Sequence, residues 1–184
     1  QITLPSSITS IEAYAFSGCT SITQITIPNS VNNIGEHSFS YCTSITTIEL
    51  SNSIQTISPF SFNHLESLES IVIPESVNDI QNYAFSNCRK IKSLTLNNGL
   101  KIIGPQSFSF NFELLSIELP DSVVEIQQYC FYRCLKLQSI KLNNQIKTIA
   151  NFSFSHCSML SGTLTIPDSV TRINSYAFYS CSKI

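Results

Sequence analysis

The sequence predicts a solenoid of the α/β class, in which about eight coils of 23 residues stack along one axis. One phrase recurs with small changes, for example as IPESVNDIQNYAFSNC at 73–88 and as IPDSVTRINSYAFYSC at 166–181. A fixed period of about 20–50 residues is the signature of a repeat architecture. The phenylalanine of the phrase recurs after 23 residues six times and then after 24, at Phe16, Phe39, Phe62, Phe85, Phe108, Phe131, Phe154 and Phe178.

Each coil begins with a predicted strand. In the second coil the segment ITIP (25–28) alternates apolar and polar residues, which is typical of a strand with one buried face. Proline ends this segment in five coils, and turn residues such as Asn-Ser, Glu-Ser or Asp-Ser follow. Stacked coils would join these strands into a parallel sheet on the concave face of the solenoid.

The rest of each coil has neither a clean strand period nor a clean helix period. We predict a short extended piece followed by a tight helical turn on the convex side, as from Val77 to Cys88 in the fourth coil. One such coil cannot bury its apolar side chains alone, so neighbouring coils must share a core. The predicted structural core contains the eight phenylalanines and the recurring cysteines Cys42, Cys88, Cys134 and Cys157.

The cysteines follow the repeat. Six of the seven lie three residues after the repeat phenylalanine, and only Cys130 does not. Recurrence at one offset is typical of a buried packing position, because free cysteine behaves as a small hydrophobe. We therefore predict reduced, buried thiols. Disulfides between neighbouring coils stay open as an alternative, as does a metal or redox role for Cys130 and Cys134.

The composition excludes several classes of function. Charged residues make up 12% of the chain, the formal net charge is −2, and Lys and Arg form no local cluster. Nucleic acids and anionic membranes are therefore poor candidate partners. No apolar run approaches the roughly 20 residues that span a bilayer, so we expect no membrane insertion of this segment.

No residue pattern points to catalysis. No Ser–His–carboxylate or Cys–His pairing is apparent for His37, His64 or His156, and no glycine-rich phosphate loop occurs. No cysteine pair has the Cys-x2-Cys spacing of a zinc site. We predict that the chain is not an enzyme and that it has no catalytic residue, no cofactor and no metal.

One residue in each predicted strand would point outward on the concave face. Hydroxyl and β-branched residues suit any exposed sheet, but solenoids also use such extended faces for binding. We expect a protein or a glycan as the partner. The candidate interaction face consists of Thr26, Glu49, Val72, Thr95, Glu118, Lys141 and Thr165.

The repeat pattern L-x-x-I-x-I-P-x-S-V-x-x-I-x-x-x-A-F-x-x-C-x-x-L, carried by residues 68–91, resembles the BspA-like (Treponema-type) leucine-rich repeat. The resemblance covers essentially the whole chain and implies a leucine-rich-repeat solenoid. The departures fall in alternate coils, which suggests a superunit of 46 residues. Proline is replaced at Ser51, Asn97 and Asn143, and cysteine at Leu65 and Asn111.

The resemblance implies a non-catalytic surface or secreted protein that attaches to host cells or to the extracellular matrix. The usage of Ile, Asn and Ser favours an AT-rich genome, such as that of a parasitic protist like a trichomonad. A cytoplasmic scaffold, which unpaired thiols would favour, and a structural stalk are the alternatives. Residues 1–184 read as one repeat array cut from a longer protein with both ends uncapped, and open strand edges would permit end-to-end self-association.

Overall fold

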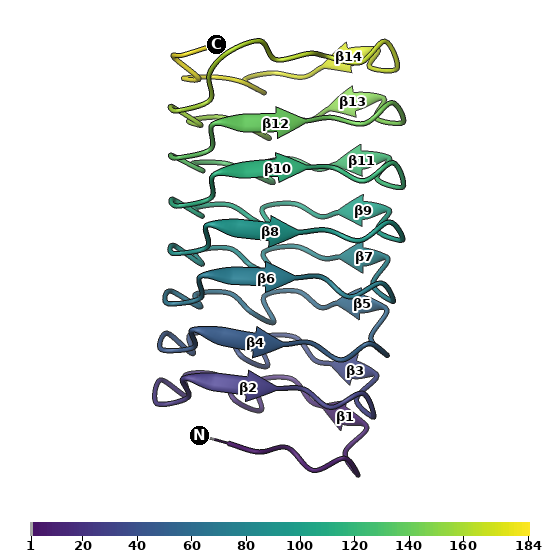
Figure 1. Ribbon diagram of the computed structural model, residues 1–184, viewed down its shortest axis with the longest axis vertical. Coiled ribbons are helices and arrows are strands. Elements are labelled where there is room, and N and C mark those ends of the chain that lie inside the picture. The colour runs from purple at the N-terminus through teal and green to yellow at the C-terminus, as the bar shows by residue number, and fades with distance from the viewer. Residues whose placement is uncertain (1) are drawn as a thin grey trace.

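The computed structural model describes residues 2–184 as a parallel β-solenoid. It has about seven turns of roughly 23 residues each (Figure 1). The sequence predicted about eight coils because it has eight repeat phenylalanines. Eight residues spaced one turn apart have seven turns between them. Gln1 lies outside the described residues, so the predicted array is described from Ile2 onward.

One side of the solenoid, here called the long-strand face, holds strands of three residues. In each strand the central residue points inward and its two neighbours are exposed, as the alternation predicted. Paired strands are parallel and lie one repeat apart, so that Ile25 stands opposite Ile48. The strands are β2 (Gln24–Thr26), β4 (Thr47–Glu49), β6 (Ser70–Val72), β8 (Ser93–Thr95), β10 (Ser116–Glu118) and β12 (Ser139–Lys141).

A second side, the short-strand face, holds strands of two residues, which are the predicted short extended pieces. Six of them form one continuous parallel sheet from β5 to β14, whereas β1 pairs with β3. Figure 1 shows this row beside the long strands. The strands are β1 (Ser10–Ile11), β3 (Asn33–Ile34), β5 (Thr56–Ile57), β7 (Asp79–Ile80), β9 (Ile102–Ile103), β11 (Glu125–Ile126), β13 (Thr148–Ile149) and β14 (Arg172–Ile173).

The third side, here called the turn face, holds the turn segment that follows each short strand, such as residues 82–90 in the fourth coil. The prediction of tight helical turns in this segment was wrong. No helix occurs among residues 2–184, so the α/β class is not supported either. Consecutive β-turns take the place of the helix, because two residues per coil have a left-handed backbone. In the fourth coil these are Tyr83 (φ 57°) and Asn87 (φ 60°). A right-handed helix cannot include such residues.

The amide groups of the turn face bond between coils. The Phe85 N–H donates to the carbonyl oxygen of Ser107 in the next coil, at 2.8 Å, and the other repeat phenylalanines before Phe178 make the equivalent bond. In a helix these amides would bond within their own segment. The turn face therefore continues the hydrogen-bond network of the two strand faces around the solenoid.

The core is a column of phenylalanine rings along the solenoid axis. The six rings from Phe39 to Phe154 are fully buried, while Phe16 and Phe178 in the terminal coils are partly exposed. Neighbouring rings stack nearly parallel with centroids 5.1–5.6 Å apart. Each ring thus covers the next, and inner coils depend on their neighbours for burial.

The repeat cysteines lie beside this column. Each of Cys42, Cys88, Cys134 and Cys157 is fully buried, and its thiol donates to the carbonyl oxygen of the phenylalanine 26 residues earlier, at 3.0–3.4 Å. Burial, which disfavours the thiolate, raises the pKa of Cys88 to about 12. All seven cysteines are free thiols in the structure. The cysteine slot therefore joins neighbouring coils without a disulfide.

The long strands pair two by two, with the period of the superunit that the alternation suggested. Strand β2 pairs with β4, β6 with β8, and β10 with β12, whereas no ladder joins β4 to β6 or β8 to β10. In the second coil of each pair, a serine or asparagine side chain donates to carbonyl oxygens of the first coil. Ser51 donates to Val31, Asn97 to Pro74 and Val77, and Asn143 to Pro120 and Val123. Proline has no such donor in the same slot.

Candidate interaction surfaces

The predicted interaction face lies in one exposed row on the long-strand face. Thr165 is also exposed but lies outside any strand. The extra residue near Gly162 (φ 79°) falls just before it and interrupts the strand row after β12. The other six residues each end a strand: Thr26, Glu49, Val72, Thr95, Glu118 and Lys141.

The charges of this row are mostly satisfied within the row itself. The Thr26 hydroxyl donates to Glu49 Oε2 at 3.1 Å, and Lys141 forms an ion pair with Glu118. Between these pairs lies Val72, which is 64% exposed and stands opposite Thr95. The face therefore offers hydroxyl groups and a small apolar centre rather than a strong electrostatic field.

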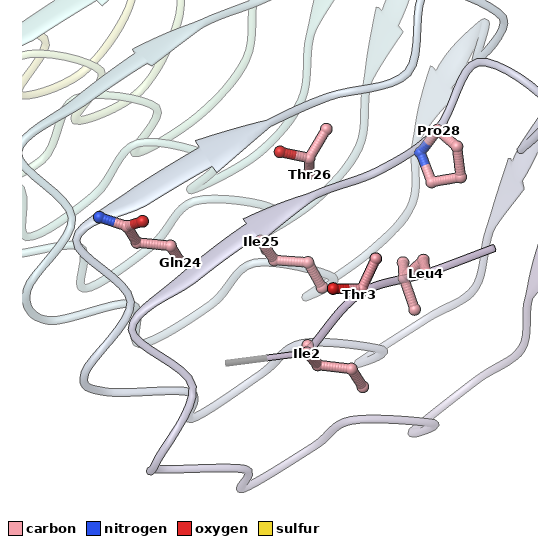
Figure 2. Close-up of a pocket in the computed structure, with 7 residues that line it drawn as sticks. All are labelled: Ile2, Thr3, Leu4, Gln24, Ile25, Thr26 and Pro28. Atoms are coloured by element: carbon pink, nitrogen blue, oxygen red, sulfur yellow. The ribbon is translucent and has the colours of Figure 1, made fainter. Parts of the chain in front are cut away.

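Open grooves lie between neighbouring coils along the long-strand face. One lies between residues 94–96 of the β8 coil and the β10 coil, beside Glu118 and Pro120. Figure 2 shows another, where residues 2–4 run alongside β2. It is lined by Ile2, Thr3, Leu4, Gln24, Ile25, Thr26 and Pro28. Small-molecule sites are usually deep clefts, so these grooves favour contact with an extended surface.

The turn face carries a second stack of rings, the aromatic ladder, to which the sequence prediction assigned no role. Its members stack with centroids 4.5–4.8 Å apart, except where Gln106 takes the slot and donates to the Tyr83 hydroxyl. The signal in the sequence is a tyrosine, histidine or phenylalanine two positions before the repeat phenylalanine. The members are Tyr14, His37, Phe60, Tyr83, Tyr129, Phe152 and Tyr176.

The ladder is a structural feature rather than a platform for a ligand. His37 lies between Tyr14 and Phe60, with ring centroids at 4.8 and 4.5 Å, so both faces of its ring are covered. A sugar or base binds an aromatic side chain through the ring face. Phe60 and Phe152 are likewise stacked on both ring faces, so these rings leave mainly their edges to solvent.

The titratable groups do not converge on one place. Within residues 2–184, no three side chains of His, Cys, Asp or Glu come together as a metal site. His37 and His64 stack on different aromatic neighbours, and His156 contacts Tyr132 edge-on. The described part of the chain also has no helix with the length and apolar character to cross a membrane.

Parallel strands repeated every 23 residues around a shared phenylalanine core define a leucine-rich-repeat solenoid. A sequence model described as the BspA type leucine rich repeat region matches in six copies, over residues 1–110 and 55–184. The chain therefore belongs to the BspA-type leucine-rich-repeat family. A search of curated proteins found no match.

Several solved structures are similar. A leucine-rich-repeat protein of Treponema pallidum shares 31% identity over 86% of this chain and 77% of its own, with a TM-score of 0.79. One from Eubacterium ventriosum shares 27% identity over 94% of this chain and 46% of its own, with a TM-score of 0.80. A leucine-rich cell surface protein of Faecalibacterium prausnitzii shares 26% identity, covering 94% and 55%, with a TM-score of 0.55. The chain spans about half the length of the last two proteins.

Proposed function

We propose that this chain is a non-catalytic adhesion module of a surface or secreted protein, which binds host cells or matrix proteins through its long-strand face. Leucine-rich-repeat solenoids are generally protein-interaction folds. A similar solved structure is described as a cell surface protein. The observation that supports this proposal most is the exposed row that ends the six long strands, because these residues all face solvent on the same side of the solenoid.

The centre of the proposed site is Val72 with Thr95. Binding energy at protein interfaces concentrates where apolar side chains lose water, and mutually satisfied charges at the rim contribute less. Val72 is the exposed aliphatic residue of the row, and the satisfied pairs Thr26–Glu49 and Glu118–Lys141 lie on either side of it. A partner would therefore make apolar contact at Val72 and hydrogen bonds to the surrounding hydroxyl groups.

The binding test uses a double variant that the fold already tolerates elsewhere. Val72→Glu with Thr95→Lys copies the Glu118–Lys141 pair, so it removes the apolar centre without adding net charge. We expect it to weaken binding to immobilised matrix proteins by about tenfold or more. Ser44→Glu with Ser67→Lys is the matched control, because it copies the Glu113–Lys136 pair away from the long strands and should leave binding unchanged.

Localisation needs a separate test. An antibody to this segment should label intact source cells without permeabilisation. Labelling only after permeabilisation would contradict the surface assignment and favour a cytoplasmic scaffold.

In the binding test, equal binding by the double variant, the control and the unchanged chain would contradict the long-strand face as the site.

A further inference from the structure

Charge is unevenly distributed along the solenoid, although Lys and Arg form no local run. Residues 2–88 contain seven acidic residues and no Lys or Arg. Residues 89–184 contain all ten Lys and Arg and five acidic residues. The formal charge is therefore −7 before Arg89 and +5 from Arg89 onward. The small net charge is thus the sum of an acidic N-terminal half and a basic C-terminal half.

Some of these cations are neutralised between coils, and others are not. Arg89, Lys92, Lys136 and Lys141 each pair with a glutamate one coil earlier. On the short-strand face, Lys101, Lys147 and Arg172 are exposed and form no ion pair within the described residues. An unpaired cation row on one face favours an anionic partner.

The same part of the face also exposes aliphatic side chains. Ile102 is 37% exposed and Val124 is 51% exposed, and the Val124 N–H bonds to the Lys101 carbonyl oxygen at 3.2 Å. Coils nearer the N-terminus have polar residues in these two slots, such as Thr56 and Asn32. Ile173 is also exposed, but it is not counted among these aliphatic side chains. It occupies the inward-facing slot of its strand and is exposed only because it lies in the last coil.

A hollow beside these residues is lined by Val124, Glu125, Lys147 and Asn174, among others. Two carboxylates border Ile102 in the register, because Asp79 stands opposite it in one strand pair and Glu125 in the other. The strands beneath belong to the continuous six-stranded sheet, which makes this a regular and well-supported surface. We call Lys101, Ile102, Val124, Lys147 and Arg172 the basic–apolar patch.

We propose that the basic–apolar patch docks an acidic polypeptide segment that carries aliphatic side chains beside its carboxylates. The cations select carboxylates, and Ile102 with Val124 select aliphatic groups, which a sulfated glycan lacks. A second copy of the chain is a poorer fit, because a stable interface uses roughly 20–30 residues a side and this patch has far fewer. The patch lies on a different side from the long-strand face, so it is independent of the proposed adhesion site.

The test uses a fluorescein-labelled peptide of alternating Glu and Val, and fluorescence anisotropy at low salt. Lys101→Gln with Lys147→Gln should weaken binding by about 5- to 20-fold. Ile102→Thr with Val124→Asn should weaken it by about threefold or more. These changes copy residues of equivalent slots, namely Gln55, Thr56 and Asn32, so folding should persist. Lys90→Gln with Lys183→Gln removes the same charge elsewhere and should leave binding within about twofold.

Four outcomes would overturn the proposal. One is no binding of the Glu-Val peptide at low salt, and another is an equal loss in the Lys90 and Lys183 control. A third is heparin binding as tightly as the peptide, with no effect of the Ile102 and Val124 changes, which would indicate a general polyanion surface. The fourth is a salt-sensitive dimer in sedimentation that the Lys101 and Lys147 changes dissolve, which would make a second copy the occupant.

Discussion

At the scale of single residues, the cysteine slot shows how one position can strengthen or weaken a coil. In most coils it holds a thiol that donates to a phenylalanine carbonyl oxygen of the preceding coil. Asn111 occupies the slot in the fifth coil and is fully buried. Neither atom of its amide group has a hydrogen-bond partner among residues 2–184. A buried polar group without a partner costs stability.

We therefore expect Asn111→Cys to stabilise the protein. The new thiol would donate to the carbonyl oxygen of Phe85, and the unsatisfied amide would be removed. The free energy of unfolding should rise by about 1–3 kcal/mol in urea denaturation. The reciprocal change Cys88→Asn should lower it, and an Asn111→Cys protein no more stable than the parent would contradict the assignment.

The buried thiols also predict a dependence on alkaline pH. Because burial raises the pKa of Cys88 from 9.0 to about 12, the folded state favours the protonated thiol. This contribution is complete below pH 9 and is lost as the pH rises toward 12. By pH 10 the loss should be about 1 kcal/mol for this group. Unfolding measured at pH 8 and pH 10 should therefore show a smaller decline in Cys88→Leu, which copies Leu65, than in the parent chain.

At the level of structural elements, the turn face shows why the prediction of helical turns was wrong. Apolar spacing alone does not distinguish a helical turn from a series of β-turns, since both bring residues three apart together. Among residues 2–184, fifteen residues other than glycine have a positive φ, and they include bulky ones such as Phe60 and Tyr129. That conformation is costly for such residues. Ring stacking and hydrogen bonds between coils, which no single repeat contains, compensate for the cost.

The pairing of coils depends on a few side-chain amides and one hydroxyl. The Asn97 amide donates to the Pro74 carbonyl oxygen at 2.6 Å and to that of Val77 at 3.0 Å, and its Oδ1 accepts from the Gly99 N–H at 2.6 Å. Because Asn97 is buried, these backbone groups have no ready access to water. Asn97 therefore acts as a structural link within the pair of coils.

Asn97→Ala should lower the free energy of unfolding by about 1–3 kcal/mol, since it leaves buried carbonyl and amide groups without partners. Asn97→Ser should lose less, because Ser51 makes a related bond in the same slot. Urea denaturation of both variants would measure the difference. An alanine variant as stable as the serine variant would show that the link is unimportant.

At the scale of the whole molecule, coils contribute to stability mainly through their neighbours. The alternation of proline with serine or asparagine makes the pair of coils, rather than the single coil, the repeating unit of the long-strand face. A deletion that removes a whole pair keeps this alternation. A deletion of one coil places Asn97 directly after the Ser51 coil.

We expect the chain without residues 74–119 to unfold at a higher urea concentration than the chain without 74–96, although it is shorter by one coil. The longer deletion joins Ile73 to Pro120 and restores the order of proline and polar coils. The shorter one joins Ile73 to Asn97 and breaks it. Far-UV circular dichroism during the titration would follow both. A more stable single-coil deletion would contradict the two-coil unit.

The repeat, the strand rows and the outward-facing residues could all be predicted from the order of the amino acids. These features follow from local periodicity, because a repeat phenylalanine every 23 residues and an alternating strand need no knowledge of distant residues. The same reasoning placed six residues in one row, and in the structure each is exposed at the end of its strand. They are Thr26, Glu49, Val72, Thr95, Glu118 and Lys141.

The turn face, the aromatic ladder and the basic–apolar patch depend instead on contacts between coils. The left-handed turns exist because neighbouring coils supply their hydrogen bonds and ring contacts, so no single repeat reveals them. The patch depends on which cations form an ion pair with a glutamate one coil away. Lys136 pairs with Glu113, whereas Lys147 has no such pair within the described residues. Such pairings join residues that are distant in sequence, and they are therefore settled by the stacking of coils rather than by any local pattern.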